Sequence, residues 1–220
     1  MLMLPRLSAA VSGLWVVIYW GTVIVKAVRL GRKIGKDPNV LPRETTGRGL
    51  RLLWTPAIFA WCILPWLSAI HGFSQVWWLR PFWPMTPHTQ WIGVAATLLG
   101  LVALILTFIC WRQMGRSWRI GIDPAEKTEL VIRGAYRIVR HPIYALSIIL
   151  MLCTLLAVPT IPMLATAMIH ITLITLEALR EEQYLRKIHG APYTAYCGST
   201  GRFIPRLTGP RQRNWIESHE

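Results

Sequence analysis

The residues that could do chemistry in this chain gather in short polar runs beside apolar segments. The first run, residues 140–144, reads Arg-His-Pro-Ile-Tyr and lies where a basic segment meets a long apolar one. Proline is favoured in the first turn of a helix, because its missing N–H would be unpaired there. The run therefore predicts a helix start at Pro142. It can serve as a positively charged flank with an interfacial tyrosine, or as an anion site in which Arg140 and the open N–H groups hold a carboxylate or phosphate.

The second run is acidic and follows another apolar segment. Glu177 and Glu181 are four residues apart, so they share one helical face, and Glu182 follows directly. His170 precedes Glu177 by seven residues and falls on the same stripe. A histidine within a membrane span is a functional candidate, and its alternative is a neutral ring bonded to a neighbouring hydroxyl or carbonyl. Carboxylates near a helix carboxyl end oppose the helix dipole, which favours a site over a merely solvated helix end.

A third run combines aromatic and basic side chains near the carboxyl end. Tyr193 and Tyr196 are three residues apart, and Arg202 and Phe203 follow before Pro205. Aromatic rings beside a basic residue could enclose a purine ring. They could equally anchor the chain at a membrane interface.

Apolar segments must position these runs. The chain is 53% hydrophobic and only 15% charged, whereas soluble domains carry about a quarter charged residues. We expect an all-α integral membrane protein with five spans. The last two are short, about 25 Å each at 1.5 Å per residue, and a proline-rich turn joins them into a helical hairpin. The expected spans are Ser8–Val28, Leu52–Ile70, Thr89–Trp111, Pro142–Val158 and Ile161–Leu176.

The distribution of basic residues predicts the topology. Lysine and arginine number eight in residues 26–51, one in residues 72–88, seven in residues 112–140 and seven from residue 180 onward. Cytoplasmic loops carry the excess of basic residues. We therefore expect a multi-pass protein, in a bacterial inner membrane, with its amino terminus outside and its carboxyl terminus in the cytoplasm. The hairpin then brings residues 140–144 beside residues 177–182 at the cytoplasmic face. Such a site has a cationic and an anionic half, which suits a zwitterion.

Charge and cysteine usage exclude other classes. The formal net charge is +14, but the basic residues lie in blocks between apolar runs, so no nucleic-acid partner is expected. The four cysteines form no C-x-x-C pair, and no metal site is expected. Membrane lipids are the expected surroundings. The basic loop of residues 26–51 is expected mainly to set topology, and binding of anionic lipid is its alternative role.

An ordered set of short motifs resembles the isoprenylcysteine carboxyl methyltransferase family, including its bacterial and archaeal members and the related phospholipid methyltransferases. The resemblance covers about Leu98–Leu207, roughly half of the chain. No single motif is specific to this family. The ordered set is specific, with a two-helix hairpin between its Arg140–Tyr144 and Glu181-Glu182 motifs. The motifs are Gly115-Arg116-Ser117-Trp118, Leu130-Val131, Gly134, Tyr136, Arg140-His141-Pro142-x-Tyr144, Glu181-Glu182, Leu185, Gly190, Tyr193-x-x-Tyr196 and Arg202-Phe203-x-Pro205.

The resemblance implies S-adenosylmethionine as methyl donor, bound in a cytoplasmic carboxyl-terminal segment together with the hairpin ends. It implies that Arg140 and Glu181 act in methyl transfer. The cofactor-binding residues that it implies are His141, Tyr144, Glu182, Tyr193, Tyr196, Arg202 and Phe203. The last four of these would close over the adenosine.

The expected function is methyl transfer to a lipid-linked or hydrophobic acceptor, foremost a carboxylate such as that of an isoprenylcysteine. Alternative acceptors are a phospholipid amine or a small thiol. A reductase-like protein that binds NADPH, as sterol reductases do, and a non-enzymatic membrane protein are the alternatives from other classes. The expected regions are a two-helix amino-terminal region (1–88), a methyltransferase core (89–207) and a polar tail (208–220). The acceptor and the oligomeric state stay open.

Overall fold

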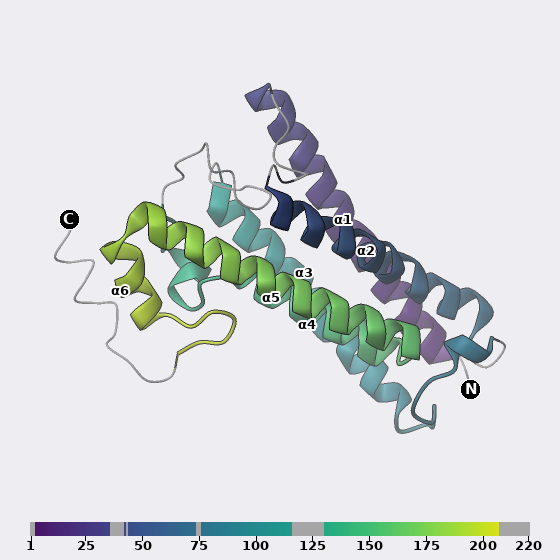
Figure 1. The fold of residues 1–220 in the computed structure, drawn as a ribbon. Coiled ribbons are helices and arrows are strands. Elements are labelled where there is room, and N and C mark those ends of the chain that lie inside the picture. The colour runs from purple at the N-terminus through teal and green to yellow at the C-terminus, as the bar shows by residue number, and fades with distance from the viewer. Residues whose placement is uncertain (1–2, 36–41, 43, 74–75, 116–129, 207–220) are drawn as a thin grey trace.

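The computed structural model describes residues 3–35, 42, 44–73, 76–115 and 130–206, and its fold is shown in Figure 1. The described part is helical and has no strands, only two isolated β-bridges. Arg116, Ser117 and Trp118, which belong to the resemblance, and the polar tail 208–220 lie outside the described residues. The helices are α1 (Met3–Ile34), α2 (Thr45–His71), α3 (Gln90–Met114), α4 (Pro142–Ala157), α5 (Ile161–His189) and α6 (Ala191–Ser199), with short 3₁₀ turns η1 (Trp77–Leu79) and η3 (Gly134–Arg137).

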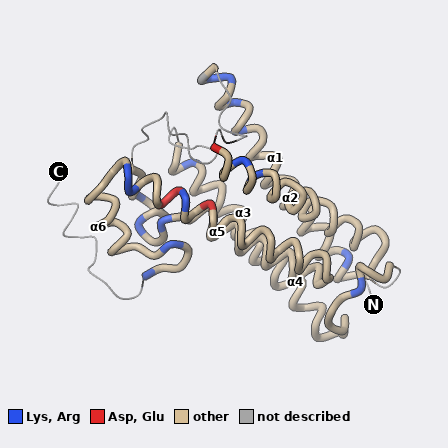
Figure 2. The backbone as a smooth tube through the Cα atoms, viewed as in Figure 1, with Lys and Arg blue, Asp and Glu red and all other residues tan. Residues whose placement is uncertain are grey.

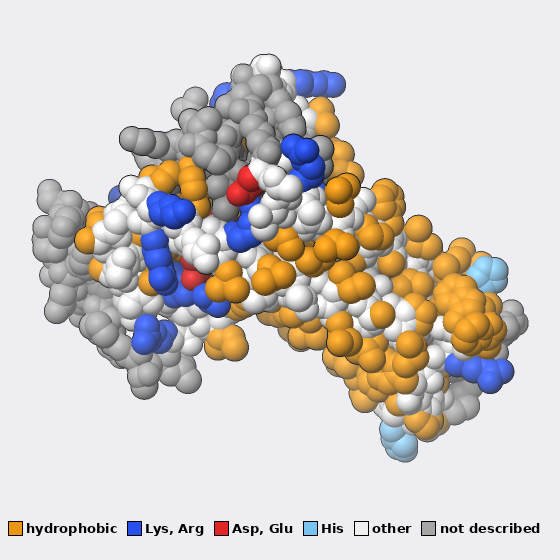
Figure 3. Space-filling model, viewed as in Figure 1, with side chains coloured by type: hydrophobic (Ala, Val, Ile, Leu, Met, Phe, Trp, Pro, Cys, Tyr) orange, Lys and Arg blue, Asp and Glu red, His pale blue; other side chains and the backbone are white. Residues whose placement is uncertain are grey.

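Four of these helices, α1, α2, α3 and α5, are long and apolar enough to cross a membrane, and α4 is a shorter apolar helix. Large hydrophobic side chains lie exposed along them, and on the face seen in Figure 3 they form a broad apolar belt across the bundle. Lysine, arginine and glutamate residues gather instead at the end that carries α6 and the last turns of α5 (Figure 2). This is the surface of an all-α membrane protein with one charge-rich end.

The hairpin of α4 and α5 is present, but its second arm is longer than predicted. α4 has 16 residues, whereas α5 has 29 and continues past Leu176 to His189. The predicted span ended with the apolar stretch, although the acidic run that follows was expected to be helical. Residues 177–189 contain neither glycine nor proline and are mostly good helix formers, so the helix goes on as a polar extension until Gly190, whose φ is 58°. Figure 1 shows this extension running beyond α4 toward α6.

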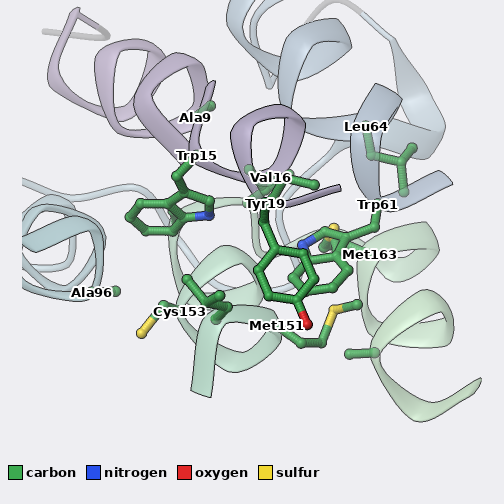
Figure 4. Packing of buried hydrophobic residues seen from close by; sticks show 14 of the residues in the cluster. Ala9, Trp15, Val16, Tyr19, Trp61, Leu64, Ala96, Met151, Cys153 and Met163 are labelled. Carbon is green, nitrogen blue, oxygen red and sulfur yellow. The ribbon is translucent and has the colours of Figure 1, made fainter. Parts of the chain in front are cut away.

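Aromatic rings fill the core between α1, α2 and the hairpin. Trp15, Trp61 and Trp111 are almost fully buried, and Tyr19 lies with its ring centroid 5.3 Å from that of Trp111. Figure 4 shows Tyr19 and Trp61 beside methionines of the hairpin. The ring of Trp15 occupies the space that a side chain at Gly100 would need, so α1 and α3 approach closely. This packing fixes α1 and α2 against the hairpin that carries the polar residues.

Candidate functional site

The start of α4 is joined to the segment that follows α6. His141 is the N-cap of α4, and Pro142 takes the first helical position. Gly201 forms a parallel β-bridge with Val139. The backbone N–H of Arg140 donates to the carbonyl of Gly201 at 2.8 Å. The N–H of His141 donates to the carbonyl of Arg202 at 3.1 Å. Residues far apart in the sequence thus meet at the charge-rich end of the bundle.

Glu182 lies at the centre of this junction and holds two guanidinium groups. Arg140 donates to its Oε1 from Nε at 3.1 Å and from Nη2 at 3.0 Å. Arg202 donates from Nε to Oε1 and from Nη2 to Oε2, both at 2.9 Å. The side chains of Glu182 and Arg140 are only 4% and 10% exposed. The carboxylate is therefore a largely buried clamp between α4 and the segment after α6.

Arg140 has little donor capacity left. Its Nη1 donates to the carbonyl of Cys197 at 3.2 Å and to that of Thr200. Together with the bonds to Glu182, these occupy four of the five N–H groups of a guanidinium. Arg202 is 33% exposed, and its hydrogen bonds to Glu182 raise its pKa above the ordinary value, so it stays cationic.

Glu181 has a different environment from its neighbour Glu182. Its side chain is 28% exposed, and its Oε2 lies 3.7 Å from Nδ1 of His141. The Tyr144 hydroxyl interacts electrostatically with this carboxylate. The His141 ring stacks on Tyr144 at 5.3 Å with an interplanar angle of 3°, and Phe203 lies 6.1 Å from it at 60°. The outcome is an accessible carboxylate beside a wall of aromatic rings.

His141 contributes a buried nitrogen to the same junction. Its side chain is 6% exposed, and Nε2 lies 3.4 Å from Oε1 of Glu182 without the geometry of a hydrogen bond. Charge attraction at that distance requires a protonated ring, whereas a neutral ring leaves the nitrogen unpaired. A ligand that reaches His141 can therefore complete its hydrogen bonding.

The two tyrosines of α6 pack against one another beside the clamp. Their ring centroids are 5.9 Å apart at 56°. Tyr196 donates to the carbonyl of Tyr136 at 2.6 Å, and the buried hydroxyl of Tyr193 has no partner among the described residues. Burial raises the pKa of Tyr193, Tyr196 and Tyr136 above the ordinary value for tyrosine. These hydroxyls stay protonated near neutral pH, so they can donate hydrogen bonds but cannot act as bases.

His170 lies away from this junction, inside the bundle. The indole N–H of Trp54 donates to its Nδ1 at 3.0 Å, and its Nε2 lies 3.1 Å from Oγ of Ser147. Because an indole nitrogen can only donate, Nδ1 must accept, which assigns the proton to Nε2. His170 therefore has the bonding of a neutral ring that links α2, α4 and α5, which is the structural one of its two expected roles.

The structure also reveals residues that sequence reasoning did not single out, on α2 and next to the acidic run. Arg180 donates both to Glu177, on its own helix, and to Glu44, the N-cap of α2. The two glutamates thereby share one arginine, and the start of α2 is fixed against α5. Glu44 and Arg180 are 136 residues apart, and no pattern in the sequence connects them.

Much of the part of the chain that forms this junction is similar to a known protein family. The phospholipid methyltransferase family model matches residues 89–192. That family belongs to the same group of membrane methyltransferases as the isoprenylcysteine carboxyl methyltransferases. The match extends from the start of α3 to the start of α6.

Among curated proteins, the chain is 26% identical over 129 residues to the nickel-cobalt-cadmium resistance protein NccN of Alcaligenes xylosoxydans xylosoxydans. The alignment covers 56% of this chain and 58% of that protein, so the chain spans little more than half the length of its relative. No solved structure matches the chain significantly.

Proposed function

We propose that this protein is an integral membrane methyltransferase that uses S-adenosylmethionine and acts on a lipid-linked or hydrophobic acceptor. The observation that carries the proposal is the junction of Arg140, Glu182 and Arg202 with the partly exposed Glu181 beside it. It lies at the charge-rich end of an apolar bundle, and all of it except Arg202 falls within the matched residues 89–192.

The chemistry of the junction fits a zwitterionic donor. S-adenosylmethionine supplies an activated methyl group on a sulfonium, together with an ammonium and a carboxylate. Glu181 offers a partly exposed carboxylate to the cationic parts. Arg202 is partly exposed and bonds Glu182 through Nε and Nη2 only, which leaves Nη1 for the donor's carboxylate. The unpaired hydroxyl of Tyr193, buried beside these charges, provides one further donor.

The protein residues then act mainly by alignment. Arg140 and Glu182 hold the start of α4 against the segment after α6, so that Glu181 and the His141–Tyr144 pair keep a fixed spacing. Fixed spacing and exclusion of bulk water are what an in-line displacement requires. A carboxylate acceptor needs no general base. An amine or thiol acceptor must lose a proton, and Glu181 or His141 is the group placed to take it.

The acceptor that we favour is a carboxylate on a hydrophobic chain, such as that of an isoprenylcysteine. A phospholipid amine is the second candidate, because the matching family is that of phospholipid methyltransferases. The apolar belt supports an acceptor that enters from the lipid (Figure 3). The name of NccN refers to resistance to three metals and specifies no reaction, so it does not distinguish between these acceptors.

The charge-rich end is proposed to face the cytoplasm, with the amino terminus outside. Basic residues predominate at this end, which supports that orientation. The donor would therefore enter from the aqueous side and the acceptor from the bilayer.

The test is methyl incorporation from radiolabelled S-adenosylmethionine into a membrane lipid extract, with the base lability of the product measured. A base-labile product is expected, because a methyl ester hydrolyses readily. A base-stable product would indicate that the acceptor is an amine or a thiol and not a carboxylate. If the purified protein transferred no methyl group while reducing an acceptor with NADPH, the proposal would be wrong.

A further inference from the structure

Helix α2, which lies outside the matched residues 89–192, forms one wall of the proposed site. Trp54 and Ala57 of α2 pack with Leu173 and Ile174 of α5 in a small apolar cluster, and Tyr144 lies against it. The ring of Tyr144 is the one that stacks on His141. The second and third turns of α2 are therefore adjacent to the site, and their side chains can reach an acceptor.

Arg51 is the charged side chain of this wall. Its guanidinium carbon lies 6.0 Å from the ring centroid of Trp54, three residues further along α2. It interacts electrostatically with the Tyr144 hydroxyl and the Glu177 carboxylate. The guanidinium therefore lies beside the Trp54 ring, against whose cluster Tyr144 packs.

The three arginines that bond the acidic run already have hydrogen-bonded partners. Arg140 and Arg202 hold Glu182, and Arg180 joins Glu177 to Glu44. Within the described part of the chain, the guanidinium of Arg51 donates no hydrogen bond. Because Arg180 already neutralises Glu177, Arg51 is a cation on the α2 side of the site with all five N–H groups available.

The surroundings of Arg51 suit the headgroup of a lipid. Leu52 and Leu53, the next two residues, are 62% and 64% exposed on the apolar surface. A hydrocarbon tail can lie along them while its polar end reaches Arg51. The first turns of α2 also add the positive end of the helix dipole.

We propose that Arg51 binds the anionic group of the methyl acceptor, a carboxylate or a phosphate on a hydrophobic chain, and so selects the acceptor. This inference rests on the proposed function. It places a cation against the acceptor and the carboxylate of Glu181 against the donor's sulfonium. Charges then alternate along the line of transfer, which draws acceptor and donor together.

The experiment compares three acceptors with wild-type protein and two variants, Arg51→Gln and Arg51→Lys. The acceptors are N-acetyl-S-farnesylcysteine, which has a carboxylate, phosphatidylethanolamine, which has a phosphate, and an uncharged alkyl thiol. For whichever anionic lipid is methylated, Arg51→Gln should raise the acceptor KM at least about tenfold, as expected for truncating one member of a charge pair. The Kd of S-adenosylmethionine should not change. Arg51→Lys should recover part of the loss, and the preferred lipid identifies the anionic group.

Arg48→Gln is the matched control, because Arg48 is exposed one turn earlier on the same helix and carries the same charge. An equal rise in KM for Arg48→Gln would show a general effect of surface charge and would overturn the inference. An unchanged acceptor KM in Arg51→Gln, with or without a fall in thermal stability, would also overturn the inference. A preference of the wild-type protein for the uncharged thiol would overturn it as well. Failure of the wild-type protein to bind S-adenosylmethionine would instead overturn the proposed function itself.

Discussion

Glu182 should be needed for the structure of the site, whereas Glu181 should be needed for its reaction. Glu182 accepts four hydrogen bonds from Arg140 and Arg202 and is almost fully buried. Replacing it by glutamine removes the charge that both guanidinium groups face and keeps a single acceptor oxygen. The change therefore weakens the attachment of residues 200–203 to the start of α4.

The size of the effect follows from the burial of the three groups. Removing one partner of a buried ion pair costs about 3–5 kcal/mol. Arg202 is 33% exposed, and water therefore screens the charge interaction between Arg202 and Glu182. We expect a loss of about 3 kcal/mol in the local opening free energy of this junction, which corresponds to roughly a hundredfold change in its opening equilibrium.

Hydrogen exchange can measure this change at two amides. The N–H groups of Arg140 and His141 donate to the carbonyls of Gly201 and Arg202, so their exchange reports separation of the two segments. In Glu182→Gln these amides should exchange roughly a hundredfold faster than in the wild type. Amides in the middle of α3 should be unaffected, because they lie far from the junction in the bundle (Figure 1).

Glu181→Gln is the matched control. This neighbouring side chain is 28% exposed and lies 3.7 Å from His141 instead of bonding the two arginines. The variant should keep the exchange rates of the wild type and lose methyl transfer. If Glu182→Gln left the two amides protected, or if Glu181→Gln exposed them equally, the distinction between a clamp and a reacting carboxylate would be refuted.

Three further predictions follow from the geometry. His170→Leu should lower the free energy of unfolding by about 1 kcal/mol, because hydrogen bonds between membrane helices average about 0.6 kcal/mol each and the His170 ring bonds two helices. Thermal unfolding should show this loss while S-adenosylmethionine still binds, and abolished binding would contradict a structural role. Gly201→Ala should weaken donor binding at least about tenfold by titration calorimetry, because its Cβ would overlap the Ile204 carbonyl oxygen; Gly198→Ala, which has open space, should bind as the wild type does. Burial raises the pKa of Tyr193, so above about pH 10, where a free tyrosine ionises, the unfolded state loses a proton that the folded state keeps. The free energy of unfolding should therefore fall as the pH rises above about 10, and it should fall less steeply in Tyr193→Phe. Equal pH dependence of stability in the two proteins would contradict the raised pKa of Tyr193.

The positions of the helices could be predicted from the apolar segments, and the apposition of residues 140–144 with residues 177–182 from the hairpin. Pro142 marked the start of α4 correctly. The end of α5 could not be predicted in this way, because residues 177–189 are polar and yet continue the helix. Apolar content reports where a helix can lie in lipid, and helix propensity with a terminating glycine reports where it ends.

The direct hydrogen bonds between the polar runs could not be predicted from the spacing of their residues in the sequence. The cationic and acidic halves were expected to face a ligand across a gap, whereas Arg140, Arg202 and Glu182 bond one another directly. The contribution of α2 was also unpredictable. Trp54, Arg51 and Glu44 reach partners on α4 or α5 that are around 100 residues away in the sequence, and no local pattern encodes such contacts. The assignment of the individual site residues stays a prediction.

The central claim is that this junction binds S-adenosylmethionine, and calorimetric titration of the purified protein in detergent tests it most directly. The account predicts saturable binding at one site per chain, displacement by S-adenosylhomocysteine, and no competition from NADPH. Absence of saturable binding, or displacement by NADPH, would contradict it.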